Sequence, residues 1–240
     1  MNEVSAYNVP ISEPMRKATI PEDHDRRRPG PEPRFSRDEL ARRALAILDA
    51  QGPEGLTMRA LAAELGMGTM ALYRYFPSKR ELMDAAVEIA APRIELPDRG
   101  VHDWKRQLGS LARELFDAGM RHPSLARERF TRPLTGPATM RVTDAAIALL
   151  LHAGLSNSEA VAAFKALLLF TLGAAAAAAS ESSPEVREHA SSRHAVVPAA
   201  ELPAMASVAD ELTAALGDDQ AFELGLAALI DGIELRTRHK

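Results

Sequence analysis

The sequence predicts an all-α protein, in which a small helix-turn-helix domain precedes a larger helical domain. Apolar residues recur every three or four positions along most of the chain, which is the spacing of amphipathic helices. Three of the expected helices open with a Ser followed three residues later by a Glu, the pattern of a capping box. No segment alternates apolar and polar residues as a half-buried strand does.

The composition excludes several classes of protein. The 240 residues include no Cys, which excludes disulfides, thiolate metal sites and thiol catalysis. No uninterrupted apolar run reaches the ~18 residues of a membrane span, because the longest, from Ala160 to Ala179, contains Lys165. The N-terminus lacks the apolar core of a signal peptide. We therefore expect a cytoplasmic protein without a membrane partner.

Charge is distributed unevenly along the chain. The segment 34–80 holds eight basic and five acidic residues, a net charge of +3 in a chain whose total is -4. A basic module joined to an acidic remainder is typical of a regulated DNA-binding protein. Residues 1–33 lack periodicity and contain several prolines and three consecutive arginines, so we expect a disordered arm. The alternative is that these arginines lie along DNA.

The first predicted helix begins at Ser36, which forms a capping box with Glu39, and ends at Gly52-Pro53. Two short helices follow. Thr57 caps the first, and Gly66 ends it, because a residue without Cβ can adopt the left-handed conformation of a helix end. A buried Leu72 on the second completes the spacing of a helix-turn-helix.

The outward residues of this unit favour nucleic-acid binding over an ordinary pair of packed helices, the alternative reading of the same spacing. They are hydrogen-bond donors and flat rings, not the Glu and Lys mixture of a solvated face. Lys79, at the start of the next helix, is placed to meet a phosphate. The DNA-binding residues predicted in this way are Thr57, Thr69, Tyr73, Arg74, Tyr75 and Lys79.

The rest of the chain predicts a helical bundle. A fourth helix starts at Ser78 and stops at Pro92, and the segment 92–102 forms a joint between domains. Further helices are expected over 103–119, 124–130, 140–154, 156–179 and 204–216, with a last helix after Gly217. The segment from Ser182 to Pro203 has little apolar content, so we expect a mobile loop there.

Two features of this bundle point to binding partners. The large apolar side chains of the bundle fit two arrangements: they line a cavity, or they fill a solid core. The candidate pocket residues are Trp104, Leu111, Phe116, Phe130, Met140, Phe164 and Leu168, with Arg132, His152 or Lys165 as polar groups. Small residues on the long helix let a second copy approach, as an alternative to contacts within the chain. The candidate dimerisation residues are Gly173, Ala174, Phe222, Leu226, Leu229 and Ile233.

Residues 36–91 resemble the DNA-binding domain of the tetracycline-repressor (TetR) family. The resemblance is carried by the run from Gly55 to Gly66 and by the run from Leu72 to Leu82. The later segments Thr131-Arg132-Pro133, Phe170 to Gly173 and Gln220 to Glu234 resemble the tetracycline-repressor subclass itself.

The resemblance implies a homodimeric repressor on a palindromic operator, released by a small-molecule effector. It implies DNA contacts by Arg59 and Met70 beside those named above, an effector pocket near Thr131 to Pro133, and a four-helix dimer bundle formed by 157–180 and 219–236. Glu128 stands where the drug-binding members have a metal-liganding His, so we expect an effector less polar than a magnesium–tetracycline chelate. The expected parts are an arm (1–33), a DNA-binding domain (34–92) and a ligand-binding and dimerisation domain (93–240).

Two alternatives differ in function. An enzyme with a helix-turn-helix appendage would need catalytic motifs, and the chain has no Gly-rich phosphate loop, no His-x-x-x-His pair and no Ser with a plausible base motif. We therefore expect no enzymatic activity and no cofactor. A transcriptional activator of the same fold cannot be separated from a repressor by sequence.

Overall fold

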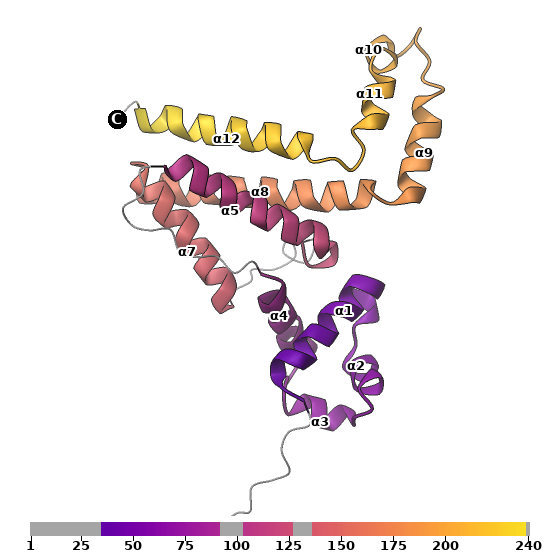
Figure 1. The fold of residues 1–240 in the computed structure, drawn as a ribbon, viewed down its shortest axis with the longest axis vertical. Coiled ribbons are helices and arrows are strands. Elements are labelled where there is room, and N and C mark those ends of the chain that lie inside the picture. Colours follow the sequence, from indigo (N-terminus) through magenta and orange to yellow (C-terminus); the bar gives the residue numbers. More distant parts are fainter. Residues whose placement is uncertain (1–34, 92–102, 127–135, 239–240) are drawn as a thin grey trace, which may run out of the picture. The chain divides into compact units, whose positions relative to one another are not determined.

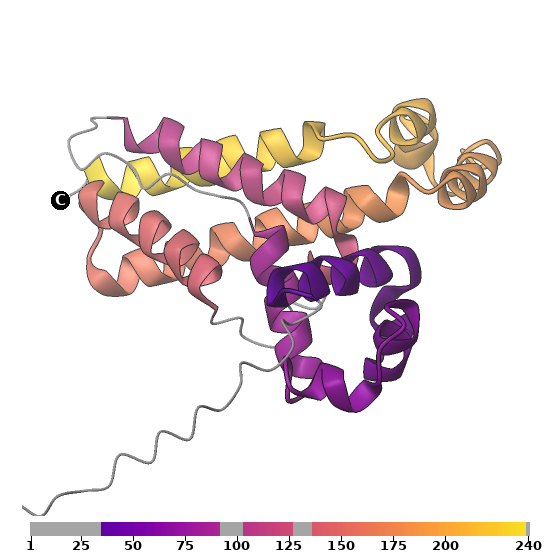
Figure 2. The same cartoon turned by 60° about the horizontal axis from the view of Figure 1, so that its bottom comes forward.

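The computed structural model describes residues 35–91, 103–126 and 136–238. These residues form helices and contain no strand, so the predicted all-α fold is confirmed for this part of the chain (Figures 1 and 2). The predicted arm at 1–33, the joint at 92–102, and Glu128, Phe130, Thr131 and Arg132 lie outside the described residues.

Four helices build the N-terminal part: α1 (Arg37–Gly55), α2 (Met58–Glu64), α3 (Thr69–Tyr73) and α4 (Lys79–Ala90). The predicted capping box opens α1, because Ser36 Oγ accepts from the Glu39 N–H at 3.1 Å and Glu39 Oε2 accepts from the Ser36 N–H at 2.7 Å. Gly52 takes a φ of 71° and kinks α1 where the sequence predicts its end.

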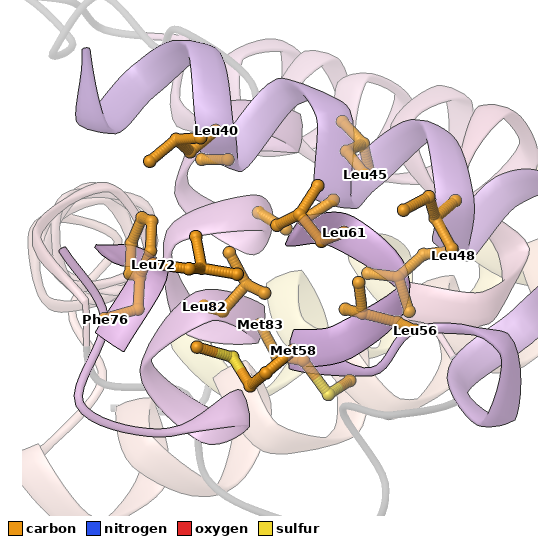
Figure 3. Close-up of a cluster of buried hydrophobic side chains, with 14 of the residues drawn as sticks. Leu40, Leu45, Leu48, Leu56, Met58, Leu61, Leu72, Phe76, Leu82 and Met83 are labelled. Atoms are coloured by element: carbon orange, nitrogen blue, oxygen red, sulfur yellow. The ribbon is translucent and has the colours of Figure 1, made fainter. Parts of the chain in front are cut away.

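The N-terminal helices enclose a leucine-rich core, and Figure 3 shows its side chains converging from all four. Its innermost members are fully buried: Leu40, Leu48, Leu56, Leu61, Leu72, Phe76 and Leu82. Contacts between α1 and α4 are the most extensive in this part, so these two helices form the frame that holds α2 and α3.

The C-terminal part is organised around α8 (Asn157–Glu181), which packs against α5 (Trp104–Arg121), α7 (Pro137–His152) and α12 (Gln220–Arg238) (Figure 1). The aromatic rings of Phe116 and Phe222 stack at a centroid distance of 4.1 Å and join α5 to α12. Phe170 of α8 lies 5.9 Å from the same Phe222 ring. Three helices therefore meet at one aromatic cluster.

Two ion pairs also join α5 to α12. Arg113 donates to both carboxylate oxygens of Glu223 at 2.7 Å, and Lys105 donates to Glu234 at 2.8 Å. The hydrogen bond from Arg113 lowers the pKa of the Glu223 carboxyl group. Both pairs are partly exposed, so they fix the register of the two helices more than they stabilise the fold.

The structure corrects the prediction of a mobile loop over 182–203. Residues Pro184–His194 form helix α9, followed by α10 (Pro203–Ala206) and α11 (Ala209–Ala214), so the predicted helix over 204–216 is two short pieces (Figure 1). No residue of these three helices is buried. Because α9 has no apolar stripe, hydrophobic periodicity gave no signal for it. It packs on α11, where His194 Nδ1 lies 2.8 Å from Thr213 Oγ1.

Helix α8 departs from the sequence expectation in another respect. By length and composition it is apolar enough to cross a membrane, with a mean hydropathy of 1.9 in its most apolar window. Core helices of soluble proteins pass the same test, and α8 is packed against three other helices. Only 33% of that window is buried within the chain, which leaves an apolar face uncovered.

Replacing Thr171 by Val should stabilise the protein. The side chain is fully buried in α8, and its hydroxyl has no hydrogen-bond partner among the described residues. Removing an unsatisfied hydroxyl while keeping its shape should raise the free energy of unfolding by about 1 kcal/mol, measured by thermal or urea unfolding. The control is Thr143→Val, which removes a hydroxyl that donates to the Thr139 carbonyl at 2.9 Å and should bring no gain. A loss of stability in Thr171→Val would show that this hydroxyl is satisfied.

Candidate nucleic-acid interface and ligand pocket

The turn between α2 and α3 is a Schellman motif. Gly66, at a φ of +59°, donates its N–H to the Ala63 carbonyl, and Met67 donates to the Ala62 carbonyl at 3.0 Å. Ala62 itself is buried, so a larger side chain would separate the two helices. This turn sets the direction in which α3 leaves the domain.

Helix α3 is five residues long and is held by a single buried side chain, Leu72. A helix this short is not stable alone, so its conformation depends on that anchor and on Phe76 behind it. On its outer side Met70 is 78% exposed and Tyr73 is 41% exposed. An apolar tip and a ring with a hydroxyl are therefore presented to solvent on a rigid support.

Arg37 of α1 fixes the end of this unit. Its guanidinium group lies 4.3 Å from the centroid of the Phe76 ring and donates a hydrogen bond to the Tyr75 carbonyl. The sequence analysis missed this role, because Arg37 is 38 residues away in the chain and looks like an ordinary first-turn residue. Arg37 holds the segment after α3 against α1.

The structure brings four predicted DNA-binding residues together on α3 and its C-cap: Thr69, Met70, Tyr73 and Arg74. Arg59 is exposed on α2, whereas Thr57 accepts the Ala60 N–H at 3.0 Å as the α2 cap. Tyr75 is half-buried against the core.

Lys79 has a partner within the chain. Its ammonium group donates to the Pro53 carbonyl at 2.7 Å and ties the start of α4 to the end of α1. An ammonium group has three protons, so Lys79 can keep the hydrogen bond to Pro53 and still donate to a phosphate.

A largely apolar pocket, here called the ligand pocket, lies between α4, α5, α7 and α8. The space between its walls and at its open mouth amounts to about 620 Å³, a volume that includes open solvent. Its described lining residues are Val87, Ala90, Ala91, Leu115, Ala118, Gly119, His122, Leu125, Ala126, Thr139, Val142, Thr143, Phe164, Leu168 and Leu172. Because α4 supplies part of the wall, a molecule in the pocket would touch a helix of the N-terminal core.

Two of the predicted pocket residues, Phe164 and Leu168, line this pocket. The structure places Leu111 and Phe116 in the packed core, with Trp104 against it, and Met140 is 61% exposed on α7. Sequence periodicity identifies which residues are apolar on one face, but cavity and core share the same pattern, so it did not separate them. Of the further polar groups, His152 and Lys165 are exposed.

Polar groups in the pocket wall are few. The Thr139 hydroxyl donates to the Gly136 carbonyl at 2.8 Å, and the Thr143 hydroxyl donates to the Thr139 carbonyl. His122 is the remaining polar side chain among the described lining residues. The sequence analysis missed it; its only signal was an isolated His before a Pro at the end of a helical stripe.

Glu88 connects α4 to the first turn of α7. Its Oε2 accepts from the Ala138 N–H at 2.6 Å, and its Oε1 lies 3.5 Å from the Thr139 N. A carboxylate at a helix N-terminus satisfies free N–H groups and is favoured by the helix dipole. Thr139 lines the pocket, so α7 is joined to α4 at the same place where it borders the pocket.

Comparison with known proteins identifies the family. Residues 40–86 match the model described as bacterial regulatory proteins, tetR family, and residues 96–237 match that of the tetracyclin repressor-like C-terminal domain. The chain belongs to the TetR family. This confirms the resemblance inferred from the sequence, and it assigns α2 and α3 to the helix-turn-helix of TetR-family regulators.

TetR-family relatives cover most of the chain. It is 35% identical over 223 residues to the HTH-type transcriptional repressor DrrR1 of Streptomyces coeruleorubidus, covering 87% of this chain and 82% of the relative. It is 35% identical over 200 residues to the class A tetracycline repressor from transposon 1721 of Escherichia coli, covering 82% and 89%. The structure of Streptomyces coelicolor ActR in complex with actinorhodin is similar, with a TM-score of 0.73, 29% identity and coverage of 83% and 95%.

Replacing Tyr73 by Ala should reduce selectivity for one DNA sequence while leaving the fold intact. The side chain is 41% exposed and supports no core contact, whereas a base contact is worth about 1–3 kcal/mol of discrimination. Fluorescence anisotropy measures the ratio of the affinities for an operator selected from a random DNA library and for a scrambled duplex. Tyr73→Phe is the matched control for the hydroxyl group. An unchanged ratio in Tyr73→Ala would remove this residue from base recognition.

Proposed function

We propose that this TetR-family protein is a ligand-responsive transcriptional repressor that binds a palindromic operator as a homodimer. The observation that carries the proposal is the shared helix α4: Leu82, Met83 and Ala86 are buried in the N-terminal core, while Val87 and Ala90 line the ligand pocket. A ligand in the pocket therefore acts on the helix that positions the DNA-binding unit.

The proposed mechanism is a shift between two conformations of this connection. A ligand that binds one conformation more tightly moves the equilibrium toward it by its difference in affinity. The helix α7 N-terminus, held by Glu88, and the α4 wall both respond to what fills the pocket. A small rotation of α4 in each protomer changes the spacing of the two α3 helices, and two half-sites one helical turn apart require a fixed spacing.

The pocket wall supports a predominantly apolar effector. Two threonine hydroxyl groups of the wall already donate to backbone carbonyls, and the other described lining residues apart from His122 are apolar. ActR binds actinorhodin in its solved complex, and an Acinetobacter baumannii TetR variant, 26% identical to this chain, binds minocycline. We propose a polycyclic or otherwise bulky apolar effector.

The dimer interface proposed here is the uncovered face of α8 together with the outer face of α12. Ala162, Ala166 and Leu169 are exposed on α8, and Leu169 is 55% exposed. Gly173 follows on the same face, where a Cβ would meet nothing within 4 Å. Glycine inside a helix costs about 1 kcal/mol relative to alanine, and close approach of a second helix is a reason to keep it.

The predicted dimerisation set changes accordingly. Phe222, Leu226 and Ile233 are buried in the core of a single chain, and Leu229 packs against that core. The outer face of α12 instead presents Leu224, which is 76% exposed. Helix α12 carries two apolar stripes, and the more continuous one is used within the protomer. Gly173 and Ala174 remain half-exposed on α8.

The remaining parts of the proposal follow from family and sequence. We propose the domain limits given above, with an arm at 1–33. We also propose that the protein acts in the cytoplasm, because the operator is chromosomal or plasmid DNA. The relatives are transcriptional regulators, which supports a regulatory and not an enzymatic role. An activator of the same fold is the second candidate, and the position of the bound operator relative to the promoter separates the two.

Selection of bound duplexes from a random DNA library tests the function. We expect enrichment of a palindrome whose half-sites lie about one helical turn apart. Addition of an effector found by screening should then release the operator. Binding that shows no sequence enrichment and only a steep salt dependence would contradict sequence-specific repression.

Replacing Leu169 by Arg should convert the dimer to a monomer and weaken operator binding at least a hundredfold. A charge placed in an apolar helix-to-helix contact would be desolvated without a partner. Analytical ultracentrifugation measures the association state. Met140→Arg is the matched control, because Met140 is a similarly exposed apolar residue on α7, outside the proposed interface. A dimeric Leu169→Arg protein would place the interface elsewhere.

A further inference from the structure

His122 stands at the end of α5, in the wall of the ligand pocket, and contacts the N-terminal domain. Its Nδ1 lies 2.9 Å and 3.1 Å from the two carboxylate oxygens of Asp49, on α1. Asp49 is not among the described residues that line the pocket. The two side chains therefore form a bridge from the pocket wall to the first helix of the DNA-binding domain.

The backbone of His122 is hydrogen-bonded through both its N–H and its carbonyl group. The His122 N–H donates to the Ala118 carbonyl at 3.0 Å, and the His122 carbonyl accepts from the N–H groups of Leu125 and Ala126. The side chain is 19% exposed, and that of Asp49 is 32% exposed. Because Nδ1 faces Asp49, Nε2 is the ring nitrogen through which His122 would bind a ligand.

We propose that Asp49 orients His122 as the polar anchor of the ligand pocket, and that the effector is a largely apolar molecule bearing a hydroxyl group. The proposal rests on the proposed function and names the chemistry of its ligand. His122 is the binding residue, and Asp49 is a positioning residue that acts through it.

The chemistry follows from the carboxylate beside Nδ1. A carboxylate that accepts a hydrogen bond keeps the proton on Nδ1 and leaves a lone pair on Nε2. Nε2 then accepts a hydrogen bond from an O–H donor in the pocket. The two threonine hydroxyl groups of the wall donate to backbone carbonyls, so they do not compete for that donor role. A phenol or enol fits this arrangement, because its ring fills the apolar space and its O–H meets Nε2.

The position of Asp49 gives this contact a regulatory consequence. Any movement of α1 relative to α5 changes the orientation of His122, so ligand binding and the placement of the DNA-binding domain depend on one another. Such coupling is reciprocal. If operator binding disturbs the bridge, it lowers the affinity for the ligand by the same factor by which the ligand lowers the affinity for the operator.

The experiment uses the full-length protein and two probes that differ by one methyl group, 2-naphthol and 2-methoxynaphthalene. Both are fluorescent and apolar, but only the first has an O–H to donate. We expect Asp49→Asn to lower the affinity for 2-naphthol about tenfold. The reason is that an amide can donate to Nδ1 and so move the ring proton to Nε2. We expect less than a twofold change for 2-methoxynaphthalene.

Two further variants separate the role of Asp49 from a general effect on structure. In a His122→Phe background, Asp49→Asn should have no further effect on either probe, because the residue it orients is gone. Asp38→Asn, which removes the same charge from the exposed first turn of α1, should leave both affinities unchanged.

Equal weakening of both probes by Asp49→Asn, or no weakening of 2-naphthol, would overturn the proposal while leaving the ligand pocket in place. Failure of the wild-type protein to bind either probe would overturn the pocket assignment as well. Operator selection from the DNA library does not depend on either probe, so a failure of the proposed function would be recognised separately.

Discussion

The contact between the Glu88 carboxylate and the first N–H groups of α7 is the interaction that joins the N-terminal core to the wall of the ligand pocket. It joins α4, which is part of the N-terminal core, to α7, which lines the ligand pocket. The contact combines a hydrogen bond with a favourable charge at a helix N-terminus, so it is directional and sensitive to small movements. In the proposed mechanism α4 transmits such movements to the helix-turn-helix, because Leu82 and Ala86 are buried in that core.

The DNA-binding unit obtains its precision from surrounding structure. Helix α3 has five residues and one buried anchor, Leu72, so its orientation comes from the Schellman turn at Gly66 and from Arg37 on α1. Because these other residues hold α3 in place, its outer side chains have no packing role. Met70 and Tyr73 are exposed although both are apolar enough to be buried, which is the arrangement expected of side chains that meet a partner.

The long helix α8 serves three surfaces at once. One face packs on α5 and α12, one contributes Phe164 and Leu168 to the ligand pocket, and one is uncovered around Leu169. Its sequence is apolar on nearly all sides because each of these three faces carries apolar residues. The same character makes periodicity uninformative there, because a helix that is apolar on all sides does not indicate which neighbour each side meets.

The sequence by itself determined the all-α fold, the helix-turn-helix and the family, because capping boxes, the Gly66 turn and the spacing of Leu61 and Leu72 are local signals. It also predicted that Tyr73 and Arg74 face outward, as they do in the structure. Tertiary structure alone decided which of the two stripes on α12 is buried, that Phe116 belongs to a core and Phe164 to a cavity, and that α9 is helical without an apolar face. It also brought Asp49 and His122 together across 73 residues. These outcomes depend on contacts between elements far apart in the chain, and no local pattern specifies which apolar surface will meet which.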